Sequence, residues 1–237
     1  MHAAILLAGG SGKRMRSTVR DKLFHPIGST NAFRLSCEAF LEAASIDFFI
    51  LVFRDMSQRE EIKREFELAS VKTGRQAPHI IVKGGKERKD SVSNALFACD
   101  RQCEFVHVHD CARPMIRPET IERLAVKVSE SGAVAVARPL SDSIRKTLQP
   151  SLDPHVPQKT ECLDRSALWL METPQVTRKD WLEDGLRKAE KRGMTVTDEL
   201  SAIELTERKV TFLDPGYPNP KITKESDLAY IKYLLKK

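Results

Sequence analysis

The hydrophobic and polar residues of this chain alternate between short apolar runs and longer amphipathic segments. A short run without polar alternation is typical of a strand buried on both faces, as in a parallel sheet. Such runs predict strands at Ala3–Leu7, Phe48–Phe53, His79–Val82, Phe105–Val108, Ala133–Ala137 and Val210–Leu213.

Helical segments are predicted between most of these strands. Ser57 and Glu60 have the spacing of a capping box, which predicts a helix running to about Leu68. The other helices are predicted at Ala32–Ala43, Ser91–Cys99, Pro118–Ser129 and Lys179–Lys191, from Asp198, and after a cap at Thr223. The alternation predicts an α/β fold with a doubly wound, mostly parallel, Rossmann-like sheet, whose ligand loops lie at the carboxyl ends of the strands.

Residues 140–170 interrupt this alternation. The segment is rich in Pro, Asp, Arg and Lys, has weak periodicity, and is too long for an ordinary loop. We therefore predict one domain over residues 1–237 with a projecting arm at about 140–170, rather than a second domain.

The composition indicates a compartment more clearly than an activity. No apolar run reaches membrane-spanning length, and the N-terminus lacks the basic region and cleavage site of a signal peptide. The five cysteines are odd in number and have no Cys-x-x-Cys spacing, which favours free thiols in a reducing environment. We expect a cytoplasmic protein.

The net charge of +6 and the pI of about 9.1 favour an anionic partner. Lys and Arg are spread along the chain, aromatic residues are few, and no basic–aromatic stripe indicates nucleic acid. A phosphorylated small molecule accounts for the charge equally well, so charge alone does not decide the partner.

The segment from Ala4 to Met15 ends a hydrophobic run in a glycine-rich loop followed by Lys13 and Arg14. The glycines allow backbone N–H groups to approach a phosphate closely, and the two cations neutralise it. Arg14 follows Gly12-Lys13 where a Walker A motif needs Ser or Thr, and Met15 takes the third small position of a dinucleotide fingerprint. Both common nucleotide motifs are therefore excluded, and a plain strand-to-helix turn is the alternative.

A second glycine pair, Gly84-Gly85, leads through a charged stretch to Ser91 at a helix start. Free N–H groups and a hydroxyl at this place suit a nucleobase, ribose or phosphate. A charged turn with a helix cap is the alternative.

The stretch from His107 to Arg113 follows another strand. His107 and His109 share a strand face with Asp110 next to them, so a His-x-His-Asp metal site is one reading. No distant carboxylate–His pair completes a catalytic zinc shell, and Asp110 and Arg113 instead suit polyol hydroxyls, magnesium or phosphate. His107 is then a structural strand residue.

No nucleophile elbow or Ser/His/Asp order is present, which is informative if the nucleophile is itself a phosphate. A phosphomonoester has a second pKa of about 6, so it is largely a dianion at neutral pH and needs no general base. Catalysis then depends on positioning and on cations. Arg14, Lys22 and Lys221 are the candidates.

Together these motifs resemble those of the 2-C-methyl-D-erythritol 4-phosphate cytidylyltransferase family over nearly the whole chain. The matching motifs are Leu-Ala8-Gly-Gly-Ser-Gly-Lys-Arg14-Met, Gly84-Gly85-Lys-Glu-Arg88-Lys-Asp-Ser91-Val, His109-Asp110-Cys-Ala-Arg113-Pro114, Asp142-Ser143, Asp164-Arg165, Thr173-Pro174-Gln175, Thr197-Asp198-Glu199 and Asn219-Pro-Lys221-Ile-Thr223. The resemblance implies that CTP and a sugar-alcohol phosphate give a CDP-alcohol and pyrophosphate, with magnesium held mainly through the CTP phosphates and no dedicated protein metal site.

The resemblance also implies roles for individual residues. Arg14 and Lys22 would hold the triphosphate and stabilise the transition state, with Lys221 assisting. CTP would be surrounded by Ala8, Gly9, Gly85, Ser91 and Asp110. The acceptor would be bound by Asp110, Arg113, Ser143, Arg165, Thr173 and Thr197. The arm would reach into the active site of a partner, which implies a twofold homodimer.

The chain departs from the family pattern at several positions. Asp21-Lys22-Leu23-Phe24 stands where Pro-Lys-Gln-Tyr/Phe is usual, and Ser143 replaces threonine. Cys111 replaces alanine and is expected to offer a thiol to oxidants or alkylating agents. Ribitol 5-phosphate cytidylyltransferases share much of the pattern, so ribitol 5-phosphate is the alternative acceptor. A metal-dependent hydrolase using the histidines is a remoter alternative, as is a non-catalytic sugar-nucleotide-binding protein.

Overall fold

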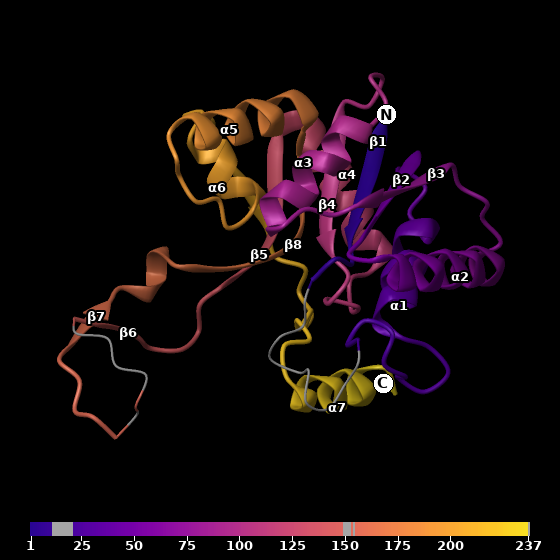
Figure 1. Ribbon diagram of the computed structural model, residues 1–237. Helices are drawn as coiled ribbons and strands as arrows, with labels where there is room; N and C mark the ends of the chain where they lie inside the picture. The colour runs from indigo at the N-terminus through magenta and orange to yellow at the C-terminus, as the bar shows by residue number, and fades with distance from the viewer. Residues whose placement is uncertain (11–20, 149–152, 154, 237) are drawn as a thin grey trace.

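The computed structural model describes residues 1–10, 21–148, 153 and 155–236, which form a central sheet covered by helices (Figure 1). The sheet strands are β1 (His2–Leu7), β2 (Phe48–Phe53), β3 (His79–Lys83), β4 (Phe105–Asp110), β5 (Ala133–Pro139), β8 (Trp169–Arg178) and β9 (Thr211–Leu213). Their spatial order is β3-β2-β1-β4-β8-β5-β9. Pairing is parallel between neighbours except at β8, which runs antiparallel to both β4 and β5. The predicted α/β, mostly parallel sheet is confirmed.

Alternate strand residues pack into two hydrophobic cores, one on each face of the sheet. In β1, Ala4 and Leu6 belong to the first core and Ala3 and Ile5 to the second. Helices α1 (Ala32–Glu42), α2 (Met56–Thr73), α4 (Pro118–Ser131) and α7 (Glu225–Leu234) cover the first core. Helices α3 (Arg88–Ala98), α5 (Lys179–Lys191) and α6 (Glu199–Glu204) cover the second. Burial on both faces explains why β1 is apolar without alternation.

The antiparallel strand β8 is an element that the sequence pattern did not predict. Its ten residues include Glu172, Thr173 and Pro174, which interrupt the apolar pattern of a buried strand. The strand nevertheless lies in the middle of the sheet, and Glu172 and Thr173 are buried. Both polar side chains have partners outside β8: Glu172 accepts from the guanidinium of Arg138 at 2.6 Å, and Thr173 accepts from the backbone N–H of Asp110 at 3.1 Å.

The predicted capping box of α2 is wrong. Asp55 is the N-cap, and its carboxylate accepts from the backbone N–H of Gln58 at 3.0 Å. The helix therefore begins at Met56, so Ser57 lies in its first turn. The N-cap of the last helix is likewise one residue beyond the predicted Thr223, at Lys224, and the helix begins at Glu225. In both cases a nearby polar residue with extended backbone took the role.

Between β5 and β8 the chain leaves the sheet and forms the hairpin of β6 (Ile144–Thr147) and β7 (Thr160–Leu163), followed by the short 3-10 helix Arg165–Ala167. The hairpin projects well away from the helices (Figure 1). We refer to residues 140–168 as the arm. Within the described part of the chain, no helix has the length and apolar character needed to cross a membrane.

Candidate functional site

A cavity of about 480 Å³ opens at the edge of the sheet that contains the carboxyl ends of the parallel strands. We call it the central cavity. It is lined by Leu7, Ala8, Gly9, Gly10, Lys22, Leu23, Arg54, Gly85, Lys86, Glu87, Arg88, Ser91, Asp110, Ala112, Lys221 and Thr223. Five of these side chains are basic and two are acidic, so the cavity suits an anionic ligand.

One wall of the central cavity is the glycine-rich stretch after β1. The backbone N–H of Ala8 donates to the carbonyl of Val52 at 3.0 Å, which continues the β1–β2 pairing. Gly9 and Gly10 follow and line the cavity. Ala8 and Gly9, which are predicted to contact CTP, thus lie in the cavity wall. Arg14 lies outside the described residues.

The second wall is the loop before α3. The Ser91 hydroxyl accepts from the backbone N–H of Gly85 at 3.0 Å and donates to the Glu87 carbonyl at 3.2 Å. A Cβ on Gly85 would lie 2.2 Å from the Cβ of Asp90, so a glycine is required for the loop to approach the helix. The buried Ser91 side chain therefore stabilises this loop, and it also lines the cavity.

Asp110 is the centre of a charged network at the end of β4. Its carboxylate lies 3.1 Å from Arg88 and 2.5 Å from Lys221, while Arg88 also makes a bidentate pair with Glu199 at 2.6 and 3.0 Å. Burial opposes ionisation of Asp110, but the charges of Arg88 and Lys221 outweigh it and hold its pKa well below the usual value. Burial raises the pKa of Glu199, although Arg88 opposes that effect. Asp110 is thus an anion that orders two cations.

Lys22 comes to the same cavity from a different segment. Its ammonium donates to the backbone carbonyl of Ile222 at 2.6 Å, next to Lys221. The following residue, Leu23, is buried in the first core, and its carbonyl accepts from the N–H of Phe33. Two of the three predicted catalytic cations are therefore brought together from positions about 200 residues apart.

Arg113 and Thr173 lie beneath the network rather than in the cavity lining. The Thr173 hydroxyl accepts from the backbone N–H of Asp110 at 3.1 Å and lies 3.1 Å from Nδ1 of His109. The Arg113 guanidinium donates to the carbonyl of Asn219 at 2.9 Å, with the carboxylate of Glu172 3.9 Å away. These contacts make both residues supports of β4 and of the segment that carries Lys221.

The remaining predicted acceptor residues are not assembled with these groups in the protomer. Ser143 and Arg165 are exposed residues of the arm, and Arg165 donates to the carbonyl of Ser141 within the arm. Thr197 is exposed just before α6 and its backbone N–H donates to Ser201. None of the three lines the central cavity.

Sequence reasoning missed several charged side chains that line the cavity or pair with its lining. Arg88 and Glu199 belong to two of the family motifs, but the sequence does not indicate that these two residues, 111 positions apart, form an ion pair. Arg54 directly follows the buried strand β2, just as the two glycine loops follow buried strands. That position could have identified Arg54 as a residue of the cavity. Lys86 lies in the second glycine loop and also lines the cavity.

The predicted alternative of a histidine metal site receives no support from the packing. His107 is fully buried and lies 3.0 Å from Nδ1 of His2, whereas His109 contacts Thr173 and the ring of Phe40. Burial lowers the pKa of both His107 and His109, that of His109 to about 3. Among the described residues, no group of three or more His, Cys, Asp or Glu side chains comes together as metal ligands.

The expectation of a reachable thiol at Cys111 is wrong. Cys111 is fully buried in the first core, and burial raises its pKa well above the ordinary value. The residue directly follows β4, and its backbone N–H donates to the carbonyl of Leu7 at 3.2 Å. Among the five cysteines, Cys162 on the arm is the exposed one.

The carboxylates of the cavity fit magnesium that is bound chiefly by a ligand. Mg²⁺ takes one or two protein carboxylates together with substrate phosphates and water, and an all-protein cage is unusual. Asp110 and Glu87 are the acidic side chains in the lining, and Asp110 is already shared between two cations. Such a donor set suits an ion that arrives with a phosphorylated ligand.

Comparison with known proteins gives a consistent match over the whole chain. Residues 2–237 match the family model for IspD, 2-C-methyl-D-erythritol 4-phosphate cytidylyltransferase. The proteins of that name from Shouchella clausii (strain KSM-K16) and Caldanaerobacter subterraneus subsp. tengcongensis are 30% and 32% identical. The matches cover 100% and 99% of this chain, and 97% and 99% of theirs. The crystal structure of 4-diphosphocytidyl-2C-methyl-D-erythritol synthase from Anaerococcus prevotii superposes with a TM-score of 0.82 at 24% identity, covering 100% and 96% of the two chains.

Proposed function

Because the chain belongs to the 2-C-methyl-D-erythritol 4-phosphate cytidylyltransferase family, we propose that it transfers CMP from CTP to 2-C-methyl-D-erythritol 4-phosphate. The products are 4-diphosphocytidyl-2-C-methyl-D-erythritol and pyrophosphate, in the non-mevalonate route to isoprenoids. The observation that carries the proposal is the central cavity, where five basic side chains meet two glycine loops at the edge of the sheet.

The reaction needs a nucleophile and charge stabilisation, and the substrates provide the first. An oxygen of the acceptor phosphate forms a bond to the α-phosphorus of CTP. The bond from that phosphorus to the bridging oxygen breaks in line, and its electron pair leaves on pyrophosphate. Since the acceptor phosphate is already an anion near neutral pH, no protein general base is required.

We assign charge stabilisation to Lys22 and Lys221, and to Arg14 by the family pattern. The ammonium groups of Lys22 and Lys221 lie around one backbone segment, so both reach a triphosphate in the cavity. Asp110 holds Lys221 and Arg88 in place, and the backbone near Ala8, Gly9 and Gly85 is available to the nucleotide. Positioned cations that act on developing charge are the main source of catalysis in phosphoryl transfer.

Magnesium is proposed as the cofactor, held mainly by the CTP phosphates, with Asp110 and Glu87 as the carboxylates of the cavity lining. When bound, it would neutralise phosphate charge. The basic side chains of the cavity lining would hold the triphosphate and align the α-phosphorus.

The acceptor site is proposed to be completed by a second copy of the chain. Arg113, Thr173 and Thr197 would come from one protomer, and Ser143 and Arg165 from the arm of its partner. The projection of the arm away from its own sheet supports this exchange (Figure 1). Sedimentation velocity should give a dimer, and removal of the arm should give a monomer without turnover.

The five cysteines form no disulfide, which supports a cytoplasmic location for the protein.

An acceptor panel tests the function. Pyrophosphate release is measured with CTP and magnesium, and with either 2-C-methyl-D-erythritol 4-phosphate or ribitol 5-phosphate as acceptor. We expect release with the first acceptor and a much lower kcat/KM with the second. Turnover with ribitol 5-phosphate alone would move the assignment to the related cytidylyltransferases, and no release with either would overturn it.

The assignment of Lys22 has its own test. Lys22→Ala should lower kcat by about 10²-fold or more, the effect of removing a single charge-stabilising donor. Lys63→Ala, an exposed lysine of α2, serves as the matched control and should keep wild-type turnover. If Lys22→Ala turned over as fast as the wild type, the mechanism would be wrong.

A further inference from the structure

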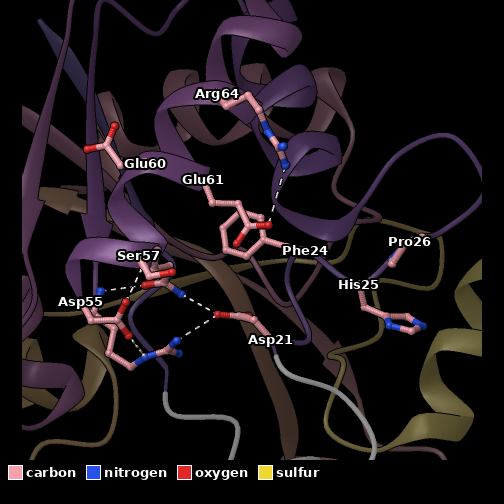
Figure 2. Close-up of a pocket in the computed structure, with 11 residues that line it drawn as sticks. Asp21, Phe24, His25, Pro26, Asp55, Ser57, Glu60, Glu61 and Arg64 are labelled. Carbon is pink, nitrogen blue, oxygen red and sulfur yellow. Dashed lines mark hydrogen bonds and ion pairs between the residues drawn. The ribbon is translucent and has the colours of Figure 1, made fainter.

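Asp21 stands where the family pattern has proline, and its side chain makes an unusual set of contacts. One carboxylate oxygen, Oδ1, accepts from the backbone N–H of Leu23 at 3.0 Å, which fixes the turn that contains Lys22. The other oxygen, Oδ2, accepts from Nε2 of Gln58 at 2.9 Å and from the guanidinium of Arg54 at 3.2 Å. The dashed lines to Asp21 in Figure 2 mark the contacts of Oδ2.

Gln58 and Arg54 carry the connection on to the glycine-rich wall of the central cavity. Nε2 of Gln58 donates to the carbonyl of Ala8 at 3.0 Å, and Arg54 donates to the carbonyl of Gly10 at 3.1 Å. The Gln58 side-chain oxygen accepts from the backbone N–H of Arg54 at 2.7 Å, so the two residues are also fixed to each other.

We propose that Asp21, Arg54 and Gln58 form a brace that positions Lys22 against the Ala8–Gly10 wall for nucleotidyl transfer. The inference rests on the proposed function and adds three positioning residues to it. Through Asp21 the brace holds the turn of the catalytic lysine. Through Gln58 and Arg54 it holds two carbonyls of the opposite wall.

Burial and charge indicate that the brace is tightly held. Gln58 is 2% exposed, and the side chain of Asp21 is 12% exposed, so a lost partner is not replaced freely by water. The carboxylate also balances the guanidinium of Arg54, which lies in the same lining as the ammonium of Lys22. Without Asp21, Gln58 and Arg54 each lose one acceptor, and the turn at Lys22 loses its anchor.

The same three residues line a second cavity of about 610 Å³, shown in Figure 2. Glu60 also lines this second cavity, but its carboxylate is exposed and pairs with its neighbour Arg59. Glu60 has no contact with the Lys22 turn among those described, which makes it a matched acidic control.

The test compares kinetics of Asp21→Ala, Asp21→Asn and Arg54→Ala with those of Glu60→Gln. A shift of about 1 Å in a catalytic group costs about 10²-fold in rate, so Asp21→Ala should lower kcat by about that factor with a smaller change in the KM for CTP. Asp21→Asn keeps the acceptor for Leu23 and should lie between Asp21→Ala and the wild type. Since the brace acts as a unit, Asp21→Ala/Arg54→Ala should be no slower than the slower single variant.

A second measurement does not depend on the acceptor. In the nucleotide-free protein, hydrogen exchange at the Leu23 amide should be at least tenfold faster in Asp21→Ala than in the wild type or Glu60→Gln. If the wild type failed to turn over, this exchange and the calorimetric affinity for CTP would still test the brace. A kcat of Asp21→Ala within twofold of the wild type, additive effects in the double variant, or unchanged exchange at Leu23 would overturn the proposal.

Discussion

The Nζ atom of Lys221 lies 2.5 Å from Oδ2 of Asp110, although 111 residues separate the two in the chain. Lys221 is more than a third exposed, while Asp110 is nearly buried, so the carboxylate fixes an ammonium that faces the cavity. The pair therefore presents a positive charge at a set place instead of on a flexible stem.

Lys221→Met is expected to lower kcat/KM by about 10²-fold, because it removes a positioned cation from the cavity. Asp110→Asn should lower it as well, since both Lys221 and Arg88 lose their anchor. Lys224→Met changes an exposed lysine three residues away and is the control. Steady-state pyrophosphate release measures all three, and equal rates for Lys221→Met and Lys224→Met would contradict the role of Lys221.

Arg88→Met is expected to destabilise the protein strongly. Glu199 is 2% exposed and pairs with Arg88, so the variant leaves a buried carboxylate without its counter-charge. Breaking a buried pair in this way costs about 3–5 kcal/mol. Urea unfolding should show that loss, and Arg88→Met/Glu199→Leu should regain much of it. A single variant as stable as the wild type would show that water or a rearranged cation satisfies Glu199.

Stability is expected to fall as the pH drops below neutral, in part because of His109. Burial lowers its pKa from 6.5 to about 3, so His109 is protonated in the unfolded chain at a pH where it stays neutral in the native state. Between those two values, unfolding is favoured more strongly as the pH falls. At pH 5 this one group accounts for about 2 kcal/mol.

His109→Gln should therefore lose less stability between pH 7 and pH 5 than the wild type. The exposed arm residue His155, changed to Gln, is the control and should leave the pH profile unchanged. Urea titrations at several pH values measure the slopes. Identical slopes for His109→Gln and the wild type would mean that His109 does not stay neutral in the native state.

Alkylation should distinguish the cysteines. Iodoacetamide is expected to modify Cys162 in the native protein, because this thiol is exposed on the arm. Cys37 and Cys111 are fully buried, and burial raises the pKa of both thiols, so they should react only after denaturation. Mass spectrometry of peptides before and after urea treatment gives the answer. Rapid native labelling of Cys111 would show that the end of β4 opens.

The sequence predicted the parallel part of the fold well, because strands such as β1 and β2 are buried on both faces and their sequence is apolar without interruption. It did not predict β8, whose polar residues are satisfied by partners distant in the chain. Thr173 bonds to β4, and Asn219 donates to the carbonyl of Thr173. Local pattern carries no information on such partners.

The predicted site shows the same division. The sequence by itself determined the glycine loops, the family, and Lys22 and Lys221 as candidate cations, because backbone freedom and fixed charge are properties of single residues and short motifs. Only the tertiary structure decided that Asp110 anchors Arg88 and Lys221, and that Asp21 is tied to Arg54 and Gln58. Which charges pair depends on three-dimensional distance and burial, and those are set when separate strands place their ends at one edge of the sheet.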